Sequence, residues 1–463
     1  MKTIFKKTII ILLSVANLSL FCFANDSSGN IELSNPKSSK ATEAWISIGR
    51  DAFELVKQEN PTLLKSQNLS QKKSDLTQPA IVKISTSQIN RLSKLMHQNY
   101  HRCPGFILHK TLSEAQSYAN NFTQNKAHKS VNYTIDNSDV VDALLGQIVS
   151  SNMSATVTSL SDLNNRYYSE QSGADASSWL KQQWENISAG RSDIQVDFFM
   201  HKDWIQPSVI TTIEGSTNPD EIVIIGGHLD SVNWTTSDAG SARAPGADDN
   251  ASGIAVITET LMAMVASDYK PQRTIKLIGY AAEEVGLLGA KDIAQNFKSN
   301  SQNVVGVAQF DMTGFHGTET ADIVFISDFT DADQNQFMKD LIDTYLPEIS
   351  YASAVCGYGC SDHAAWNNLG YPASFPFESK FADSNETIHT SGDVNFDVEH
   401  SLNFVKLSLT FAAELAKGGM SGDYTPIVTT PPEPETIARS SGGGPLGILL
   451  LLLIFVVTFF IRK

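Results

Sequence analysis

Short runs of β-branched residues alternate with amphipathic stretches, and this alternation constrains the fold more than any other feature of the chain. Glu221–His228, Thr274–Ala282 and Val304–Phe310 are rich in valine and isoleucine, whereas Ser252–Ala266 has helical spacing. Continuous apolar runs are typical of strands that are buried on both faces of a parallel sheet. Strands that alternate with helices predict an α/β fold, with a mixed, mostly parallel central sheet and helices on both faces.

The same pattern predicts further elements between residues 133 and 417, which we take as the main domain. Further strands are expected at Ile194–Phe199, Pro207–Ile213, Asp322–Ile326 and Ala373–Phe377. Further helices are expected at Ala176–Ile187, Gly286–Phe297, Gln334–Leu346, His363–Leu369 and Val398–Ala416.

The N-terminus has the features of an export signal. Lysines within Lys2–Lys7 precede the apolar run Thr8–Phe21, and Ala24 ends a possible cleavage site. This order is typical of a secretory signal peptide, which we expect at residues 1–24. Lipidation of Cys22 is the alternative, but Phe21 is large for the position before a lipid-bearing cysteine. Export implies that signal peptidase acts on the chain.

Residues 25–132 are polar, yet they contain periodic stretches. A strand is expected at Ile81–Ile84 and a helix at Ile89–His97. A small N-terminal pro-domain therefore fits this segment better than a disordered linker. A pro-segment implies an activating protease.

The C-terminus changes character twice. Residues 418–445 are rich in threonine, proline and glycine, which predicts an extended linker. The apolar segment 446–463 ends in Arg462–Lys463 and is a little short for a full membrane span of about 20 residues. It is either a tail anchor or, by its Gly-Gly-Gly and basic end, similar to the GlyGly carboxy-terminal sorting signal that a rhomboid-like protease processes. Both readings imply transient contact with the inner membrane.

Charge and cysteine usage narrow the class of protein. A formal net charge of -16 argues against a nucleic-acid partner, because an acidic surface repels phosphates. Cys356 and Cys360 are four residues apart, and in an oxidising compartment they are expected to form a disulfide. A reduced helical pair or a metal site is the alternative. Tyr358 between two glycines argues against a helix and favours a disulfide-closed loop.

Acidic residues and histidines occur where the predicted strands end. Each motif alone has an ordinary explanation, such as a surface histidine, a helix cap or an acidic helix start. Their joint occurrence at one sheet edge is better explained by metal binding. The residues are His228, Asp230, Asp248, Asp249, Glu283, Glu284, Asp311 and His389.

Zinc accounts for this choice of side chains. It binds imidazole nitrogen and carboxylate oxygen, and a catalytic site leaves one position open. Two zinc ions about 3.5–4 Å apart share a carboxylate and clamp a reacting group between them. One further carboxylate that binds no metal is needed to shuttle protons.

Several longer runs carry a family resemblance. They are Gly226–Ser231, Ala244–Gly253, Ala281–Leu287, Asp311–Met312, Cys356–His363, Phe377–Phe381 and Ile388–Thr390. Together they resemble the secreted bacterial leucyl aminopeptidases, over about Tyr133 to Ala416. The resemblance implies the zinc-dependent exopeptidase fold (phosphorylase/hydrolase-like) and two Zn²⁺ per chain.

The resemblance also implies roles for individual residues. Asp249 would bridge the metals, with Glu284 and His389 completing one zinc site and His228 and Asp311 the other. Glu283 would act as general base towards a hydroxide bound by both zinc ions, Asp230 would orient His228, and Tyr358 would stabilise the oxyanion. A cis peptide bond is implied between Asp249 and Asn250. The residues so assigned are His228, Asp230, Asp249, Glu283, Glu284, Asp311, Tyr358 and His389.

The substrate pocket follows from the same resemblance. Met312, Phe377, Phe381 and Ile388 would line it together with the Cys356–Cys360 loop. Taken alone, the two phenylalanines are equally well explained as core residues. The implied substrates are peptides with leucine or another large apolar residue at the N-terminus, and the enzyme is expected to be a monomer.

Three other functions remain open on this fold. A glutaminyl cyclase would use one working zinc, and a carboxypeptidase would present arginines such as Arg243 or Arg273 to the substrate carboxylate. A binding module built on a dead peptidase is disfavoured by the intact ligand set. His316 and His363 are expected to be structural.

One cysteine of the pro-segment suggests a latency device. Cys103 has no obvious partner, and a thiolate is a strong zinc ligand. Cys103 could therefore cap a zinc until the pro-segment is cut. The alternative is an incidental or fold-stabilising cysteine.

Overall fold

The computed structural model describes residues 43–59, 79–100, 105–121, 131–317 and 321–421. The expected signal peptide, Cys103 and the apolar segment 446–463 lie outside these residues. Within the described part of the chain, none of the helices combines the length and the apolar character that crossing a membrane requires.

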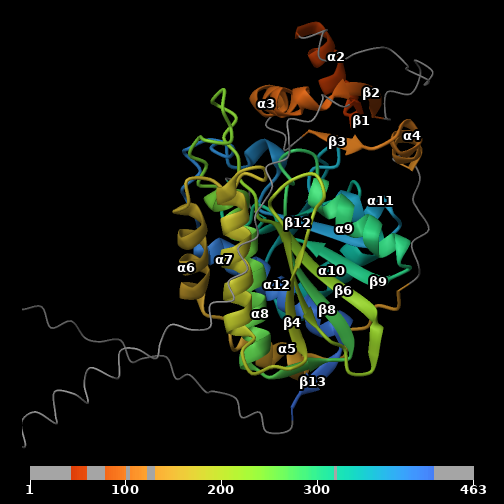
Figure 1. The fold of residues 1–463 in the computed structure, drawn as a ribbon. Coiled ribbons are helices and arrows are strands. Elements are labelled where there is room, and N and C mark those ends of the chain that lie inside the picture. The colour runs from red at the N-terminus through yellow and green to blue at the C-terminus, as the bar shows by residue number, and fades with distance from the viewer. Residues whose placement is uncertain (1–42, 60–78, 101–104, 122–130, 318–320, 422–463) are drawn as a thin grey trace, which may run out of the picture. The chain divides into compact units, whose positions relative to one another are not determined.

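A mixed sheet of eight strands lies at the centre of the main domain (Figure 1). Its strand order is β11-β10-β12-β9-β6-β8-β5-β4. The neighbours β12–β9, β9–β6 and β6–β8 are parallel, whereas β8–β5 and β5–β4 are antiparallel. The expected mixed sheet is therefore confirmed. The strands are β4 (Ile194–Phe199), β5 (Ser208–Ile213), β6 (Asn218–His228), β8 (Arg273–Tyr280), β9 (Asn303–Gln309), β10 (Ile323–Ile326), β11 (Tyr351–Ala354) and β12 (Ala373–Phe377).

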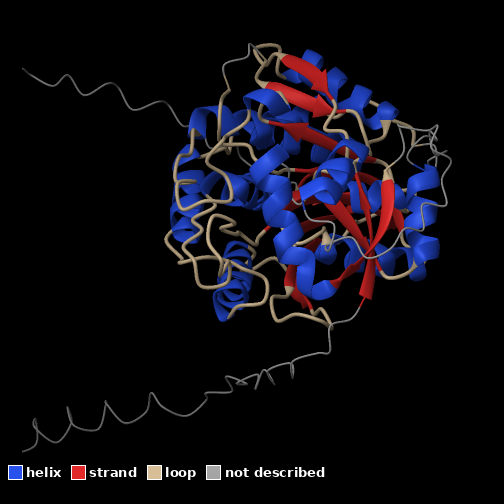
Figure 2. Cartoon of the chain, turned by 90° about the horizontal axis from the view of Figure 1, so that it is seen from above, coloured by secondary structure: helices blue, strands red, loops and turns tan. Residues whose placement is uncertain are grey.

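Helices cover both faces of this sheet, and Figure 2 shows them on either side of the strands. Alternate residues of β6 contact the two layers: Val223 and Ile225 pack in one core cluster, Ile222 and Ile224 in the other. The first cluster includes α5 (Ser138–Leu145), α6 (Ser150–Ser161), α7 (Gln171–Ile187), α8 (Gly253–Ala266), α10 (Ala332–Tyr345) and α12 (Val398–Ala416). The second includes α9 (Leu288–Ser299) and α11 (His363–Asn368).

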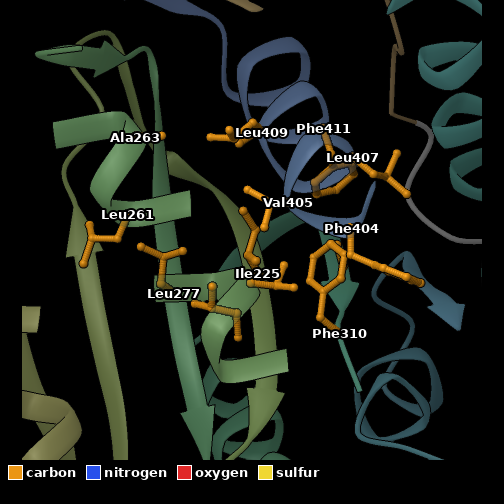
Figure 3. Close-up of a cluster of buried hydrophobic side chains, with 14 of the residues drawn as sticks. Ile225, Leu261, Ala263, Leu277, Phe310, Phe404, Val405, Leu407, Leu409 and Phe411 are labelled. Atoms are coloured by element: carbon orange, nitrogen blue, oxygen red, sulfur yellow. The ribbon is translucent and has the colours of Figure 1, made fainter. Parts of the chain in front are cut away.

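The larger core lies between the sheet and helix α12, as Figure 3 shows. Phe404 and Val405 point from α12 towards Ile225 and Phe310, and the rings of Phe404 and Phe310 meet edge to face at 6.5 Å. Each of these fully buried side chains stabilises the fold by about 1.5–3 kcal/mol. This packing fixes the carboxyl end of β6, where His228 lies.

Two glycines let β6 pack closely at the same end. A Cβ atom on Gly227 would lie 2.6 Å from the carbonyl oxygen of Phe310. A Cβ atom on Gly226 would lie 2.4 Å from the ring of Tyr280. Side chains at these positions would therefore push β9 and Tyr280 away from the strand that carries His228.

The described part of residues 43–121 forms a separate three-stranded sheet in the order β2-β1-β3. The expected strand and helix at Ile81–Ile84 and Ile89–His97 are confirmed. The elements are β1 (Glu43–Ile48), α2 (Arg50–Glu59), β2 (Ala80–Ser85), η1 (Thr86–Gln88), α3 (Ile89–Tyr100), β3 (Phe106–His109) and α4 (Leu112–Asn121).

Several boundaries differ from those expected; helix α7, for example, begins at Gln171 rather than Ala176, and strand β6 at Asn218 rather than Glu221. Helix α9 begins at Leu288 rather than Gly286, because Gly286 and Leu287 have left-handed φ values of 117° and 59°. Residues Gly418–Met420, expected to open the linker, form strand β13, which pairs with β7 (Tyr269–Pro271). The ordered fold thus continues a few residues beyond Lys417.

Candidate metal centre and substrate pocket

Six candidate residues meet at the carboxyl edge of the central sheet. They come from the ends of β6, β8 and β9, from the π-type turn η2 (Ala247–Ser252) and from the loop after β12. Each is at most 6% exposed. The structure thus brings together His228, Asp249, Glu283, Glu284, Asp311 and His389.

Two triads of ligand atoms share Asp249. The first consists of His228, Asp249 and Asp311, and the second of Asp249, Glu284 and His389; the ligand atoms of each lie within 4.8 Å of one another. In the first triad, His228 Nε2 is 3.0 Å from Asp249 Oδ1 and 3.2 Å from Asp311 Oδ1. In the second, His389 Nε2 is 2.9 Å from Asp249 Oδ2 and 3.0 Å from Glu284 Oε2. The two oxygens of Asp249 therefore face different triads.

The donor set fits zinc. The Nδ1 of His228 lies 3.1 Å from the carbonyl oxygen of Asp230, which can only accept, so Nδ1 carries the proton. In the neutral ring, Nε2 then directs its lone pair at two carboxylate oxygens about 3 Å away. Such a contact requires a positive charge between the atoms, either a proton or a metal ion. Imidazole and carboxylate in this arrangement are ligands that zinc prefers.

The protonation states of the site follow from burial and from the neighbouring charges. Burial alone would lower the pKa of His389, but Glu284 and Asp249 raise it to about 10. Burial opposes ionisation of Asp249, yet His228 and His389 hold its pKa well below the usual range. The site without metal therefore keeps positive charge on its imidazoles, which a bound cation would replace.

Glu283 belongs to neither triad, although it lies next to Glu284 in the chain. Burial raises its pKa well above that of an exposed glutamate; His228 opposes the shift, and Asp362 and Asp311 add to it. A carboxyl group with a raised pKa holds a proton readily near neutral pH, as a proton shuttle must.

Asp230 contacts both sides of the centre. Its backbone carbonyl faces the ring of His228, and its carboxylate oxygen lies 3.4 Å from the same ring nitrogen. The carboxylate also accepts the backbone N–H groups of Glu283 and Glu284, at 2.9 and 3.2 Å. The expected contact with His228 is therefore present, and the tie to the Glu283–Glu284 loop is an additional finding.

The backbone takes unusual conformations around these ligands. The peptide bond between Asp249 and Asn250 is cis, as the family resemblance implied. Ala282, Met312 and His389 have φ values of 58°, 57° and 55°, in the left-handed region that non-glycine residues rarely adopt. Such residues cluster at functional sites, where the surrounding structure enforces them.

An apolar pocket opens beside the centre. All four expected residues line it, and Phe377 stacks on Phe381 with ring centroids 5.0 Å apart. Sequence reasoning missed Phe375 and Ser384, which line the same pocket. A disulfide joins Cys356 and Cys360, as expected, and closes the loop that carries Tyr358. The lining residues are Asp249, Asp311, Met312, Tyr358, Cys360, Phe375, Phe377, Phe381, Ser384 and Ile388.

Comparison with known proteins places this geometry in a family. A model of peptidase family M28 matches residues 208–403, which include every candidate metal ligand. Leucine aminopeptidase 1 from Penicillium rubens is 38% identical over an alignment of 286 residues, and the match covers 58% of this chain and 71% of that protein. The chain belongs to peptidase family M28. It is therefore a zinc-dependent metallo-aminopeptidase of this family.

Other M28 relatives support this placement. A probable leucine aminopeptidase from Arthroderma benhamiae is 35% identical over 311 residues, 66% of this chain and 81% of that protein. The crystal structure of the LapA aminopeptidase of Legionella pneumophila is 31% identical, with a TM-score of 0.69, and covers 81% of this chain and 99% of that one. The similarity to LapA extends beyond the M28 region itself, because 81% of the chain is longer than residues 208–403.

Polar residues that were not predicted as metal ligands or catalytic residues also contact the ligands and their neighbours. Ser361 donates to Asp311 Oδ2 at 2.5 Å, which leaves Oδ1 towards His228. Asn250 accepts the N–H of Met312 and donates to the carbonyl of Phe310. His363 is buried, lies against the carbonyl of Asp328 and stacks on the ring of Phe375, in keeping with a structural role.

Proposed function

We propose that the protein removes leucine or another large apolar residue from the N-terminus of peptides, with two zinc ions held by the two triads. In this proposal His228 and Asp311 would hold one ion and Glu284 and His389 the other, and Asp249, which belongs to both triads, would contribute to each. The observation that carries the proposal is the division of the Asp249 oxygens, at 3.0 Å from His228 and 2.9 Å from His389.

Zinc bound there would act as a Lewis acid that polarises the scissile carbonyl and makes water more acidic. Glu283 is then the general base: it takes a proton from the attacking water and returns it to the leaving amine. The Asp230 carboxylate fixes the backbone of Glu283 and so the direction of its side chain. The hydroxyl of Tyr358, at the pocket wall, stabilises negative charge that develops on the carbonyl oxygen.

The pocket supports the substrate class. Its walls are aromatic and aliphatic, apart from Asp249, Asp311 and the hydroxyls of Tyr358 and Ser384. A leucine side chain gains free energy there by leaving water. Asp311, which both lines the pocket and belongs to a triad, offers a negative charge to the free amine of the substrate.

The carboxypeptidase alternative lacks its expected arginines. Arg243 is exposed and donates to the carbonyls of Leu163 and Ser161. Arg273 begins β8, at the end of the strand remote from Glu283, and pairs with Glu221. Neither lines the pocket. A glutaminyl cyclase would use a single zinc, so the metal content separates it from the proposed enzyme.

We also propose that the chain is exported as a precursor. Strand β3 of the pro-segment packs on loops next to the centre: Ile107 lies against Gly359, and Leu108 lies against Gly286. Tyr118 of the same segment stacks on Phe329 with centroids 5.2 Å apart. These contacts support a pro-segment that restricts substrate access until a protease removes it.

The latency device and the terminal segments extend this proposal. Signal peptidase would remove residues 1–24, and the segment 446–463 would hold the product at the membrane until a rhomboid-like protease acts. Cys103 would cap a zinc in the precursor. A precursor with Cys103→Ser is then active before cleavage, and latency of that variant would refute the cap.

Two measurements on the purified protein test the proposed function. Metal analysis is expected to find two zinc ions in both the wild type and Glu283→Ala, with hydrolysis of leucyl anilide lost only in the variant. Exposed Glu214→Ala serves as the control and keeps its activity. N-acetylation of the substrate is expected to abolish cleavage, and equal rates on both substrates would rule out an aminopeptidase.

A further inference from the structure

Arg166 is a fully buried arginine whose side chain points at backbone rather than at a partner carboxylate. It lies between α6 and α7 and is 0% exposed. Its guanidinium donates to four backbone carbonyls, those of Leu229 at 2.8 Å, Pro245 at 2.5 Å, Gly246 at 2.9 Å and Leu160 at 3.3 Å. Removing a charged guanidinium from water costs free energy, and an arginine cannot lose its proton to avoid that cost. A fully buried arginine is therefore unusual unless its N–H donors are hydrogen-bonded.

Three of these carbonyls belong to the two loops that carry metal-ligand candidates, and the fourth belongs to helix α6. Leu229 directly follows His228, whereas Pro245 and Gly246 precede Asp249 by a few residues. Ser231 adds a second tie, since its hydroxyl accepts the backbone N–H of Arg166 and donates to the carbonyl of Ala244. Arg166 thus joins the end of β6 to the start of the turn η2.

Asp393 accepts hydrogen bonds from backbone N–H groups of the same turn. Its two carboxylate oxygens accept the backbone N–H groups of Asp248 and Asp249, each at 3.1 Å. Its backbone carbonyl accepts the N–H of Ala247 at 3.1 Å. The segment from Pro245 to Asp249 is therefore held by carbonyl contacts at one end and by N–H contacts at the other.

The segment from Pro245 to Asp249 is packed too closely to accept a side chain at Gly246. Gly246 has a left-handed φ of 51°, and a Cβ atom there would lie 2.4 Å from the carbonyl oxygen of Asp249 and 2.7 Å from Arg166 Nη2. Arg166 also lies in the field of Asp393, Asp230 and Asp249, so its positive charge offsets part of the negative charge gathered at the centre.

We propose that Arg166 and Asp393 are positioning residues that fix the turn η2 against the end of β6, so that the carboxylate of Asp249 faces both histidines at once. This inference rests on the proposed two-zinc site. Arg166 touches neither metal nor substrate in this assignment. Its loss is expected to weaken zinc binding and lower kcat, with little effect on KM, because Arg166 does not line the apolar pocket.

The test compares Arg166→Lys with Arg243→Lys in the full chain. Lysine keeps the charge, but its single nitrogen cannot replace the three guanidinium nitrogens that donate to four carbonyls. Arg243 is the matched control, since it also donates to two backbone carbonyls, but of Leu163 and Ser161, away from the ligands. Zinc affinity is measured by chelator competition, and the thermal midpoint is measured with and without zinc.

The expected result for Arg166→Lys is a 10–100-fold loss of zinc affinity, a smaller rise of the thermal midpoint on adding zinc, and a KM within about twofold of the wild type. Arg243→Lys is expected to match the wild type. If Arg166 stabilised only the fold, Arg166→Lys would lower the thermal midpoint by the same amount with and without zinc and would leave the zinc affinity unchanged. That result would overturn the inference. An equal loss in Arg243→Lys would also overturn it.

Asp393→Asn provides a second route if Arg166→Lys does not fold. The amide keeps the size of the side chain but replaces one acceptor of a backbone N–H by a donor. The same loss of zinc affinity is expected, and an unchanged affinity would contradict the inference. If the wild type itself binds no zinc, the proposed function and this inference fall together; if the wild type binds two ions and the variants bind them with unchanged affinity, only the inference fails.

Discussion

The carboxylate of Asp230 accepts the backbone N–H of Glu283 at 2.9 Å and so ties the end of β6 to the loop that follows β8. Because the other carboxylate oxygen accepts the N–H of Glu284, one side chain fixes the backbone of both the proposed base and a proposed ligand. Its backbone carbonyl meanwhile holds the ring of His228. Asp230 therefore couples the orientation of three residues of the centre.

Asp230→Asn is expected to lower kcat by 10–100-fold, the usual range for partners that orient metal ligands. The amide keeps the backbone carbonyl for His228 but sets an N–H₂ group against a backbone N–H. Steady-state kinetics with leucyl anilide checks this, together with zinc content. Asp238→Asn is the control, because Asp238 lies in the same loop, is exposed and contacts Ser241. Equal kinetics for the two variants would contradict the assignment.

Ser361→Ala is expected to reduce zinc occupancy at the His228–Asp311 triad. The hydroxyl of Ser361 binds Asp311 Oδ2, and without it the carboxylate is free to rotate away from His228. Metal analysis after dialysis against a weak chelator measures the effect, with a loss of up to one ion per chain. Ser374→Ala is the control, since Ser374 is equally buried and contacts Gln334 instead. Retention of both ions in Ser361→Ala would count against the role.

Phe381→Ala is expected to raise KM for leucyl substrates more than for alanyl substrates. Phe381 stacks on Phe377 and forms one wall of the pocket, so its loss removes contacts that only a large side chain makes. A change of about 1–3 kcal/mol in discrimination, or 10–200-fold in kcat/KM, is the range for such contacts. Phe198→Ala, on the remote strand β4, is the control. A uniform loss on both substrates would place the substrate side chain elsewhere.

Packing of the proposed pro-segment is expected to weaken as the pH falls below about 6.5. Burial lowers the pKa of His109 from 6.5 to about 4, with Glu114 opposing the shift. A released His109 binds a proton more readily than a packed one, so stability is lost between pH 6.5 and 4. Hydrogen exchange in β1–β3, corrected for the intrinsic rate, should show less protection at pH 5 than at pH 7.

His109→Asn removes this titration and is the matched variant for the pH experiment. Its protection should differ little between pH 7 and pH 5. The Glu114–Lys291 pair, at 3.2 Å, does not account for a change in this range, because Lys291 and His109 lower the pKa of Glu114 to about 2 against the effect of burial. Equal protection of the wild type at both pH values would refute the prediction.

The strands and the metal-ligand candidates could be predicted because their signals are local. A valine- and isoleucine-rich run such as Ile222–Ile225 predicts a buried strand, and His228 at its end follows from the topology of α/β sheets. Helix α6 could not be predicted in this way. Its serines and threonines favour caps and turns, although Met153, Val157 and Leu160 form a buried helical face.

The residues that position the ligands are not marked by a local sequence pattern of this kind. Arg166 and Asp393 bind backbone atoms of loops that are far away in the sequence. Because every residue presents the same backbone carbonyl, the residue type at the contact does not reveal it. Ser361 follows the disulfide loop, where a serine is unremarkable until the position of Asp311 is known. Such contacts depend on the folded path of the chain, so sequence patterns alone do not predict them.

The order of the ligands along the chain has a consequence for maturation. His228 is made first and His389 last, with Asp249, Glu284 and Asp311 between them. The first triad has all its residues once Asp311 has been made, whereas the second needs His389, which lies beyond strand β12. Assembly of both triads must therefore wait until nearly all of the catalytic fold has been synthesised, and a chain truncated before His389 would carry only one of them.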